Sequence, residues 1–322
     1  MKTKERIFYY DLLRAFAIIA VLICHADHYF GLQSTPIETI FRITFHDIGR
    51  IGVPIFLMIS GALLLNRDYE LSDFLKRRFA RIIYPFIFWI IIIIAQLCLM
   101  GKYKGIWTVF IGDPSITWYF WALIGIYLFL PVINSFIKEY GDTGLKYFLA
   151  IWFITIILQT FNAYPPFKTF DLNYFANYIG YPILGYYLDT KVFKMSDRKV
   201  SLRGFLILLV SLAVFVTLDV NGLIDLTYLN VPIVLMGLGL FLFIKYLNVD
   251  SINPAIKKII VSLSVYSYGM YFSHTIIINI ISRYNPHKNI FFPVMFGALI
   301  FLSWLSVFLV SKIPYLKKFS GA

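Results

Sequence analysis

The chain has 322 residues, of which 60% are hydrophobic, 19% aromatic and only 14% charged, and its mean hydropathy is +0.77. Ordinary soluble domains carry about a quarter charged residues, so this composition excludes a water-soluble domain and indicates an integral membrane protein. The two cysteines, Cys24 and Cys98, both lie in apolar runs, which excludes a disulfide framework, a Cys-rich zinc site and a haem-attachment motif.

Ten stretches of the chain are long and apolar enough to form membrane-spanning helices, each of which needs about 20 residues. Their approximate limits are 8–26, 48–65, 80–100, 117–136, 146–163, 172–188, 204–220, 227–244, 259–281 and 290–311. The sixth stretch is polar for a span, and the seventh and eighth lie close together, so nine or eleven spans are alternatives. We predict an all-α polytopic bundle of about ten transmembrane helices.

Between these stretches, the longest gaps are residues 27–47, 66–79 and 189–203, and all three are predicted to be ordinary loops. No repeat, low-complexity tail or soluble extra domain is apparent. Residues 1–322 are therefore expected to form a single transmembrane domain.

The formal net charge of +12 is compatible with nucleic-acid binding as well as with the basic cytoplasmic loops of a membrane protein. With the N-terminus placed in the cytoplasm, the cytoplasmic side holds 21 of the 29 basic residues and the outer side holds 7, while Arg14 lies inside the first span. This asymmetry follows the positive-inside rule. It predicts that both termini are cytoplasmic, and it removes the main support for a nucleic-acid partner.

The first span carries three ionisable side chains, Asp11, Arg14 and His25, although charges within a span are costly. Asp11 and Arg14 are three residues apart and share a helix face. Eleven residues separate Arg14 from His25, which places both on the same face, roughly 16 Å apart along the axis. One interpretation is a structural Asp11–Arg14 ion pair near the interface, with His25 in the outer headgroup layer. The other is a polar channel along this helix. The charges and the length of this run also argue against a cleavable signal peptide.

Two segments near the second and third spans carry further polar features. Pro54 and the pair Ser60-Gly61 can open a helix or allow another backbone to approach closely. Before the third span, Arg78 and Arg81 lie three residues apart on one helix face. Such a cluster is typical of a topology signal or a contact with anionic lipid, but two neighbouring guanidinium groups also suit phosphates.

The fourth span begins with Trp118-Tyr-Phe-Trp121 and continues through Tyr127 to Pro131. An aromatic belt at the membrane surface would explain the tryptophans without any further role. His274 lies in the middle of the ninth span, where a histidine needs a polar partner. A structural hydrogen bond to another helix is the simpler interpretation of this residue.

Taken together, these segments resemble the acyltransferase-3 family, the integral-membrane acyltransferases that modify bacterial surface glycans. The similar blocks follow the order seen in that family and cover essentially the whole chain. They are Asp11-Leu-Leu-Arg14 with an Arg-x10-His spacing to His25, Gly52 to Gly61, Arg78-x-x-Arg81 leading to Tyr84-Pro85, Trp118 to Pro131, and Tyr268-Gly-Met-Tyr271 with His274. The chain resembles the members that lack an extracytoplasmic esterase-like domain.

This resemblance implies transfer of an acyl group, most often acetyl, from cytoplasmic acyl-CoA to a hydroxyl group. The acceptor would be a cell-surface polysaccharide, a lipid-linked sugar or a related exported glycan, and the protein would lie in the bacterial cytoplasmic membrane. Arg78 and Arg81 would bind the phosphates of the donor, and its pantetheine arm would pass Arg14 to bring the thioester near His25. An imidazole is suited to take the proton of the attacking hydroxyl. Direct transfer and a transient acyl-imidazole both remain open, and no metal is implied.

Supporting roles stay open at this point. The developing oxyanion needs hydrogen-bond donors, and Ser60 or Tyr127 from neighbouring spans are candidates. Asp27, Asp47 or Asp113 could orient the histidine, and no spacing favours one of them.

A glycan transporter or flippase without acyl-transfer activity is the alternative, because ten spans with polar intramembrane residues and prolines fit that class as well. Transporters often contain paired broken helices in two related halves, and the sequence shows no such symmetry. A glycan polymerase would need an arginine-rich outer loop, whereas the seven basic residues of the predicted outer loops are scattered.

Overall fold

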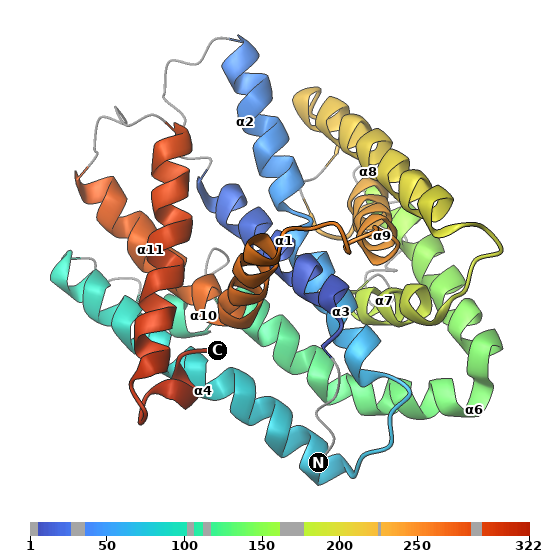
Figure 1. Ribbon diagram of the computed structural model, residues 1–322, viewed down its shortest axis with the longest axis horizontal. Coiled ribbons are helices and arrows are strands. Elements are labelled where there is room, and N and C mark those ends of the chain that lie inside the picture. Colours follow the sequence, from blue (N-terminus) through green and yellow to red (C-terminus); the bar gives the residue numbers. More distant parts are fainter. Residues whose placement is uncertain are drawn as a thin grey trace.

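In the computed structural model, which describes residues 6–26, 36–101, 106–111, 117–161, 177–224, 227–284 and 292–322, the chain is all α-helical as predicted, with no strand in those ranges (Figure 1). The helices are α1 (Phe8–Ala26), α2 (Pro36–Gly49), α3 (Gly52–Leu64), α4 (Leu71–Leu99), α5 (Ile106–Ile111), α6 (Trp118–Thr160), α7 (Gly180–Thr190), α8 (Asp197–Val220), α9 (Val231–Lys245), α10 (Pro254–Tyr284) and α11 (Phe292–Lys312), followed by a short 3-10 helix (Lys317–Phe319).

Helix α1 runs through the middle of the bundle and packs against α2, α3, α9, α10 and α11 (Figure 1). Helices α4, α10 and α11 lie on one side of it, whereas α7, α8 and α9 lie on the other, and α6 contacts members of both groups. Most apolar residues of α1, including Leu13, Ile18 and Leu22, are fully buried. The helix that carries Asp11, Arg14 and His25 is therefore surrounded by protein.

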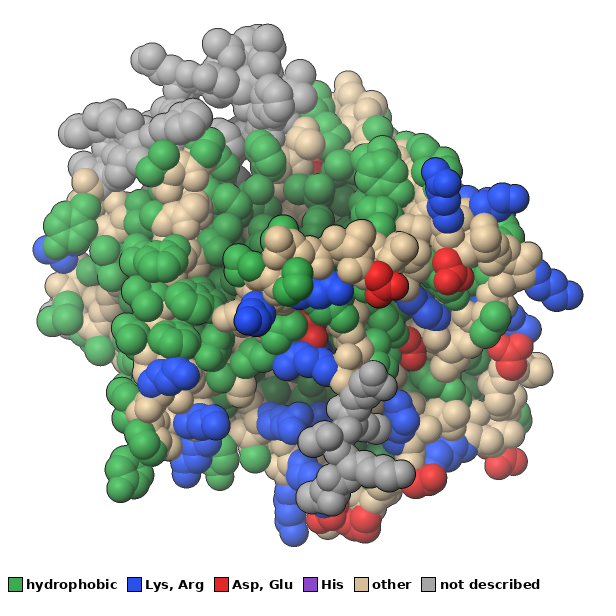
Figure 2. Space-filling view, in the orientation of Figure 1, with side chains coloured by type: hydrophobic (Ala, Val, Ile, Leu, Met, Phe, Trp, Pro, Cys, Tyr) green, Lys and Arg blue, Asp and Glu red, His purple; other side chains and the backbone are tan. Residues whose placement is uncertain are grey.

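Within the part of the chain that the structure describes, six helical stretches are long and apolar enough to cross a membrane: Phe8–Ala26, Ile43–Leu64, Leu71–Leu99, Trp118–Thr160, Asp197–Val220 and Phe292–Lys312. Large apolar side chains are exposed on the outer helices, for example Ile91 on α4, Val210 on α8 and Phe301 on α11. On the face shown in Figure 2, hydrophobic side chains dominate the left part, and Lys and Arg side chains gather along the lower part. A surface of this kind requires lipid around it, so the chain is an integral membrane protein.

The helices confirm one predicted break between spans and differ from the prediction in three loops. The predicted spans 117–136 and 146–163 both lie in α6, which consists of two helices that meet at Gly141, where the backbone is non-helical with φ 55° and ψ −140°. The break that the sequence predicts between these two spans is therefore present. The predicted loops 27–47, 66–79 and 189–203 contain most of α2 and the first turns of α4 and α8, so they are not ordinary loops. Charged and polar residues make these segments look like loops. One of them nevertheless contains a helix cap, because the Glu70 carboxylate accepts a hydrogen bond from the Asp73 N–H at 2.8 Å where α4 begins.

Small residues bring α3 and α7 into close contact, and this explains Gly61 of the second predicted span and Gly185 of the sixth. A Cβ at Gly61 would lie 1.8 Å from the carbonyl oxygen of Pro182, and one at Gly185 would lie 2.1 Å from that of Met58. Such close backbone approach is typical of packed transmembrane helices. Pro54 lies in the first turn of α3, and the helix continues unbroken through Ser60 and Gly61, so this helix does not open there.

Candidate active site

A cavity of about 890 Å³ lies between α1, α3, α4, α6 and α10, and the C-terminal segment closes one of its walls. Five cationic side chains line it: Arg6, Arg14, Arg78, Arg81 and Lys318. The remaining lining is mostly apolar or aromatic, with the hydroxyl groups of several tyrosines and serines among it. Apolar walls with a few charged groups are typical of a binding site for an organic anion.

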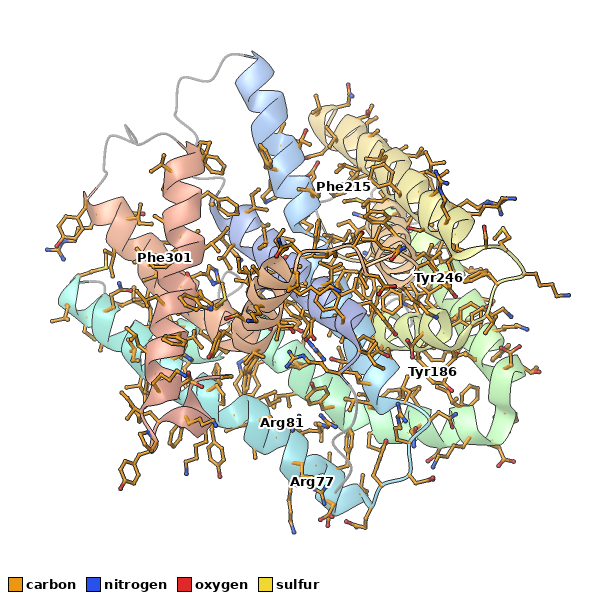
Figure 3. The ribbon with its side chains drawn as sticks, in the orientation of Figure 1. Arg77, Arg81, Tyr186, Phe215, Tyr246 and Phe301 are labelled. Carbon is orange, nitrogen blue, oxygen red and sulfur yellow. The ribbon has the colours of Figure 1, made fainter. Side chains whose placement is uncertain are left out.

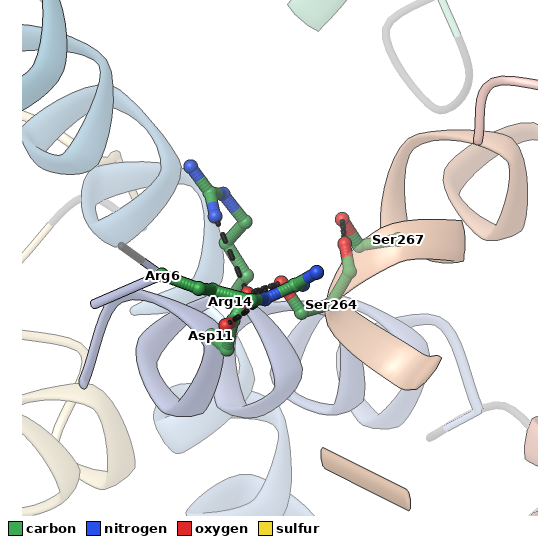
Figure 4. Close-up of polar contacts among 5 residues, drawn as sticks. All are labelled: Arg6, Asp11, Arg14, Ser264 and Ser267. Carbon is green, nitrogen blue, oxygen red and sulfur yellow. Dashed lines mark hydrogen bonds and ion pairs between the residues drawn. The ribbon is translucent and has the colours of Figure 1, made fainter. Parts of the chain in front are cut away.

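Asp11 holds two of these cations in place (Figure 4). Its carboxylate is almost fully buried and accepts hydrogen bonds from Arg6 at 2.5 and 2.8 Å and from the Ser264 hydroxyl at 2.6 Å. Arg14, one turn further along α1, lies 3.6 Å from the same carboxylate. The hydrogen bonds to Asp11 raise the pKa of the Arg6 guanidinium above its usual value. Asp11 therefore acts as a structural anchor that holds Arg14 at the cavity wall.

Arg78 and Arg81 reach the cavity from α4, on the face that their spacing of three predicts. Arg78 is half-buried, and its guanidinium lies 5.9 Å from the ring centre of Phe74, whereas Arg81 is more exposed. Arg77, which lies one turn before Arg81 (Figure 3), instead forms an exposed ion pair with Asp73 at 2.9 Å. The two neighbours Arg77 and Arg78 thus have different surroundings.

Tyr127 lines the same cavity as the arginines. It interacts electrostatically with Arg14, Arg78 and Arg81, and it lies beside the Ser60 hydroxyl. Ser60 donates its own proton to the Phe56 carbonyl at 2.9 Å. The two residues considered as oxyanion donors therefore lie in the arginine-lined cavity.

A row of tyrosines continues from Tyr127 along α6 and α10. Tyr119, Tyr268 and Tyr271 all line the cavity and interact electrostatically with one another. The rings of Tyr119 and Tyr271 are 5.3 Å apart, and the Tyr268 hydroxyl donates to the Ile82 carbonyl at 3.0 Å. These side chains make an aromatic path that leads away from the arginines.

Two histidines lie at the end of this path. The ring centres of Tyr271 and His274 are 6.0 Å apart, and those of His274 and His25 are 5.0 Å apart. His274 is almost fully buried, and its Nδ1 lies 3.1 Å from the Met270 carbonyl. A carbonyl oxygen only accepts, so Nδ1 carries the proton and Nε2 of the neutral ring keeps its lone pair. His25 is less buried and is the more accessible of the pair.

The C-terminal segment forms part of the same site. The indole N–H of Trp89 on α4 donates to the Ser320 carbonyl at 3.1 Å. On α10, a Cβ at Gly269 would lie 2.2 Å from that same carbonyl oxygen. Only glycine at this position therefore allows the C-terminal segment to pack so closely against α10. This packing places Lys318 and Gly321 in the cavity wall.

The structure brings most of the residues singled out in the sequence into one continuous site. Arg14, Ser60, Arg78, Arg81 and Tyr127 share the cavity, with Asp11 behind Arg14 and the pair His25 and His274 beyond the tyrosines. Trp118 packs instead with two tyrosines of other elements, and Asp27 and Asp113 lie outside the described residues.

Tyr119, Ser264 and Lys318 also belong to this site, although nothing in the sequence separates them from ordinary membrane or loop residues. A signal does exist for α10. Tyr268, Tyr271 and His274 follow one another at a spacing of three, which places them along one helix face.

Comparison with known proteins agrees with this arrangement. The model of the acyltransferase-3 family, described as an acyltransferase domain, matches residues 7–311. A protein of Acidianus two-tailed virus named "Putative acetyltransferase ORF330" is 27% identical over 288 residues, which cover 81% of this chain and 80% of the viral protein. No solved structure matches the chain. Because the family match extends over nearly the whole chain, the protein belongs to the acyltransferase-3 family of membrane acyltransferases.

Proposed function

We propose that the protein transfers an acyl group, most often acetyl, from acyl-CoA to a hydroxyl of a cell-surface polysaccharide, lipid-linked sugar or related exported glycan. It would act as a single multi-pass domain of about ten spans in the bacterial cytoplasmic membrane, with both termini in the cytoplasm. The 21 basic residues on the cytoplasmic side of this topology support the orientation. The arginine-lined cavity then opens toward the cytoplasm, where the donor is made.

The donor fits the cavity by charge and by shape. Acyl-CoA carries several phosphates, and Arg78, Arg81 and Lys318 offer guanidinium and ammonium donors to them near the cytoplasmic end. Arg14, held by Asp11, lies deeper along α1. The narrow pantetheine arm would follow the tyrosines, whose apolar faces and hydroxyl groups match its alternating methylene and amide groups.

His25 is the proposed general base. Its imidazole would take the proton of the acceptor hydroxyl while the hydroxyl oxygen attacks the thioester carbonyl carbon. The tetrahedral intermediate then collapses, the carbon–sulfur bond breaks, and the proton passes to the CoA thiolate. His274, whose Nδ1 is held by the Met270 carbonyl, would position His25 through the contact between the two rings.

One observation carries this proposal. A single series of side chains links the cationic cavity to the histidine pair. Tyr127 interacts electrostatically with the arginines. The ring centres of Tyr119 and Tyr271 are 5.3 Å apart, and those of Tyr271 and His274 are 6.0 Å apart. A donor bound at one end of this series can present its acyl group at the other.

Release of free thiol from acetyl-CoA by the purified protein, measured with and without a membrane glycan extract, tests the function. Glycan-dependent thiol release, and its loss in His25→Ala with unchanged acetyl-CoA binding, is the expected result. A folded wild-type protein that binds acetyl-CoA but never releases thiol would contradict the proposal. Glycan movement across vesicles without thiol release would favour the alternative, a transporter or flippase.

A further inference from the structure

A second cluster of polar and aromatic side chains lies near His25 and takes no part in the donor cavity. It consists of Arg50, Trp118, Tyr178 and Tyr228, and we refer to it as the Arg50 cluster. Each member lies at or just beside a helix end: Arg50 between α2 and α3, Trp118 at the start of α6, Tyr178 before α7 and Tyr228 before α9. All four side chains are only partly buried.

The aromatic rings of the cluster form one connected surface. Ring centres are 5.1 Å apart for Trp118 and Tyr228, 5.6 Å for Trp118 and Tyr178, and 6.5 Å for Tyr178 and Tyr228. The Arg50 guanidinium lies 5.7 Å from the centre of the Tyr228 ring, and its Nη2 lies 3.5 Å from His46 Nε2. The flat apolar faces of these three rings thus lie beside the Arg50 guanidinium, which carries several hydrogen-bond donors.

Two buried polar groups beside this cluster have no hydrogen-bond partner among the described residues. Asp47 is fully buried, and neither carboxylate oxygen accepts a hydrogen bond, although Oδ1 forms an ion pair with His46 Nδ1 at 3.7 Å. The Thr117 hydroxyl, next to Trp118, is also fully buried and unpartnered. Leaving such hydrogen-bonding capacity unused in a protein interior is unfavourable, which points to a ligand that pairs with these groups.

The cluster adjoins the proposed path of the donor. Trp118 contacts Tyr119 with ring centres 6.0 Å apart, and Tyr119 belongs to the tyrosine row. Tyr228 interacts electrostatically with both Tyr271 and Cys24, the residue before His25. A molecule held on the Arg50 cluster would therefore lie beside the histidine pair, on the side opposite the arginines.

We propose that the Arg50 cluster, together with Asp47 and Thr117, holds the sugar ring of the acyl acceptor, an inference that rests on the proposed function. A sugar ring presents apolar C–H faces to aromatic rings, and its hydroxyl groups donate to a carboxylate and accept from a guanidinium. A lipid chain would cover the rings but would leave Asp47 and Thr117 unpaired. The chemistry of this surface therefore favours a carbohydrate.

The test uses the full-length protein in detergent micelles. Methyl glycosides of glucose, galactose, N-acetylglucosamine, rhamnose and glucuronic acid are examined by saturation-transfer NMR, and acetyl-CoA affinity is measured by calorimetry. We expect at least one glycoside to receive saturation. Asp47→Asn and Tyr228→Ala should weaken its affinity at least tenfold, whereas Tyr228→Phe, which keeps the ring, should retain it. The matched controls are Asp250→Asn and Tyr315→Ala, two exposed positions.

Thermal unfolding separates ligand binding from a structural role. Asp47→Asn keeps the shape of the side chain and loses only the 3.7 Å pairing with His46, so its Tm should change little. A lower Tm with unchanged glycoside affinity, or no saturation of any glycoside by the wild type, would overturn the inference. If wild-type protein fails to bind acetyl-CoA, the proposed function itself fails; if it binds acetyl-CoA but no glycoside, only the acceptor subsite is wrong.

Discussion

Arg78 offers the most discriminating test of the donor site, because three arginines within five residues of α4 have different surroundings. Arg78 is half-buried at the cavity and forms no ion pair with a carboxylate among the described residues, so its guanidinium is available to a phosphate. A hydrogen bond to a charged partner contributes about 2 kcal/mol, and Arg78→Gln should therefore weaken acetyl-CoA binding roughly 30-fold. Arg81 also lines the cavity but is exposed, and exposed ion pairs contribute about 0.5–1 kcal/mol, so Arg81→Gln should cost about threefold.

Arg77→Gln is the matched control. Its side chain is 78% exposed, pairs with Asp73 and does not line the cavity, so the affinity should stay within about twofold. Calorimetric titration of acetyl-CoA into each purified variant gives the dissociation constants. Repeating the wild-type titration at higher salt should weaken binding, since screening acts on the phosphate contacts. Equal losses in all three variants, or no loss in Arg78→Gln, would refute this account of the donor site.

Three further predictions concern the scaffold and the histidine pair. Asp11→Ala should lower the free energy of unfolding by about 1–3 kcal/mol, since it leaves the buried Ser264 hydroxyl without its acceptor and Arg14 without its counter-charge. Asp73→Ala at an exposed pair should cost about 0.5 kcal/mol or less. Thermal unfolding in detergent compares the two, and equal Tm values would contradict the anchor role. Gly61→Val should prevent folding, since a Cβ there would lie 1.8 Å from a carbonyl oxygen of α7. The control is Gly125→Val, because a Cβ at Gly125 would meet open space. Equal yields of monodisperse protein from the two variants would show that the close contact is not required. His274→Gln should lower kcat at least tenfold with unchanged acetyl-CoA affinity; an unchanged kcat would exclude a positioning role.

The sequence predicts much of the helical architecture, because a membrane-spanning helix is recognised from the length and apolar character of one continuous stretch. The same holds for contacts within one helix. The spacing of Asp11 and Arg14, and that of Arg78 and Arg81, correctly predicts that each pair shares a face. The break between two predicted spans is also present, at the non-helical Gly141 within α6. Prediction fails where local composition misleads: most of residues 36–49 look like a polar loop but form α2.

The sequence by itself determined that this is a helical membrane protein similar to the acyltransferase-3 family, with Asp11, Arg14 and His25 on one face of its first helix. Only the tertiary structure decided that α10 packs on α1, so that Ser264 bonds Asp11 and His274 contacts His25 across more than two hundred residues of chain. Helix periodicity fixes which residues share a face of one helix. It does not select the facing helix, because in lipid every apolar surface is equally well solvated and the partner is chosen by close packing and interhelical hydrogen bonds.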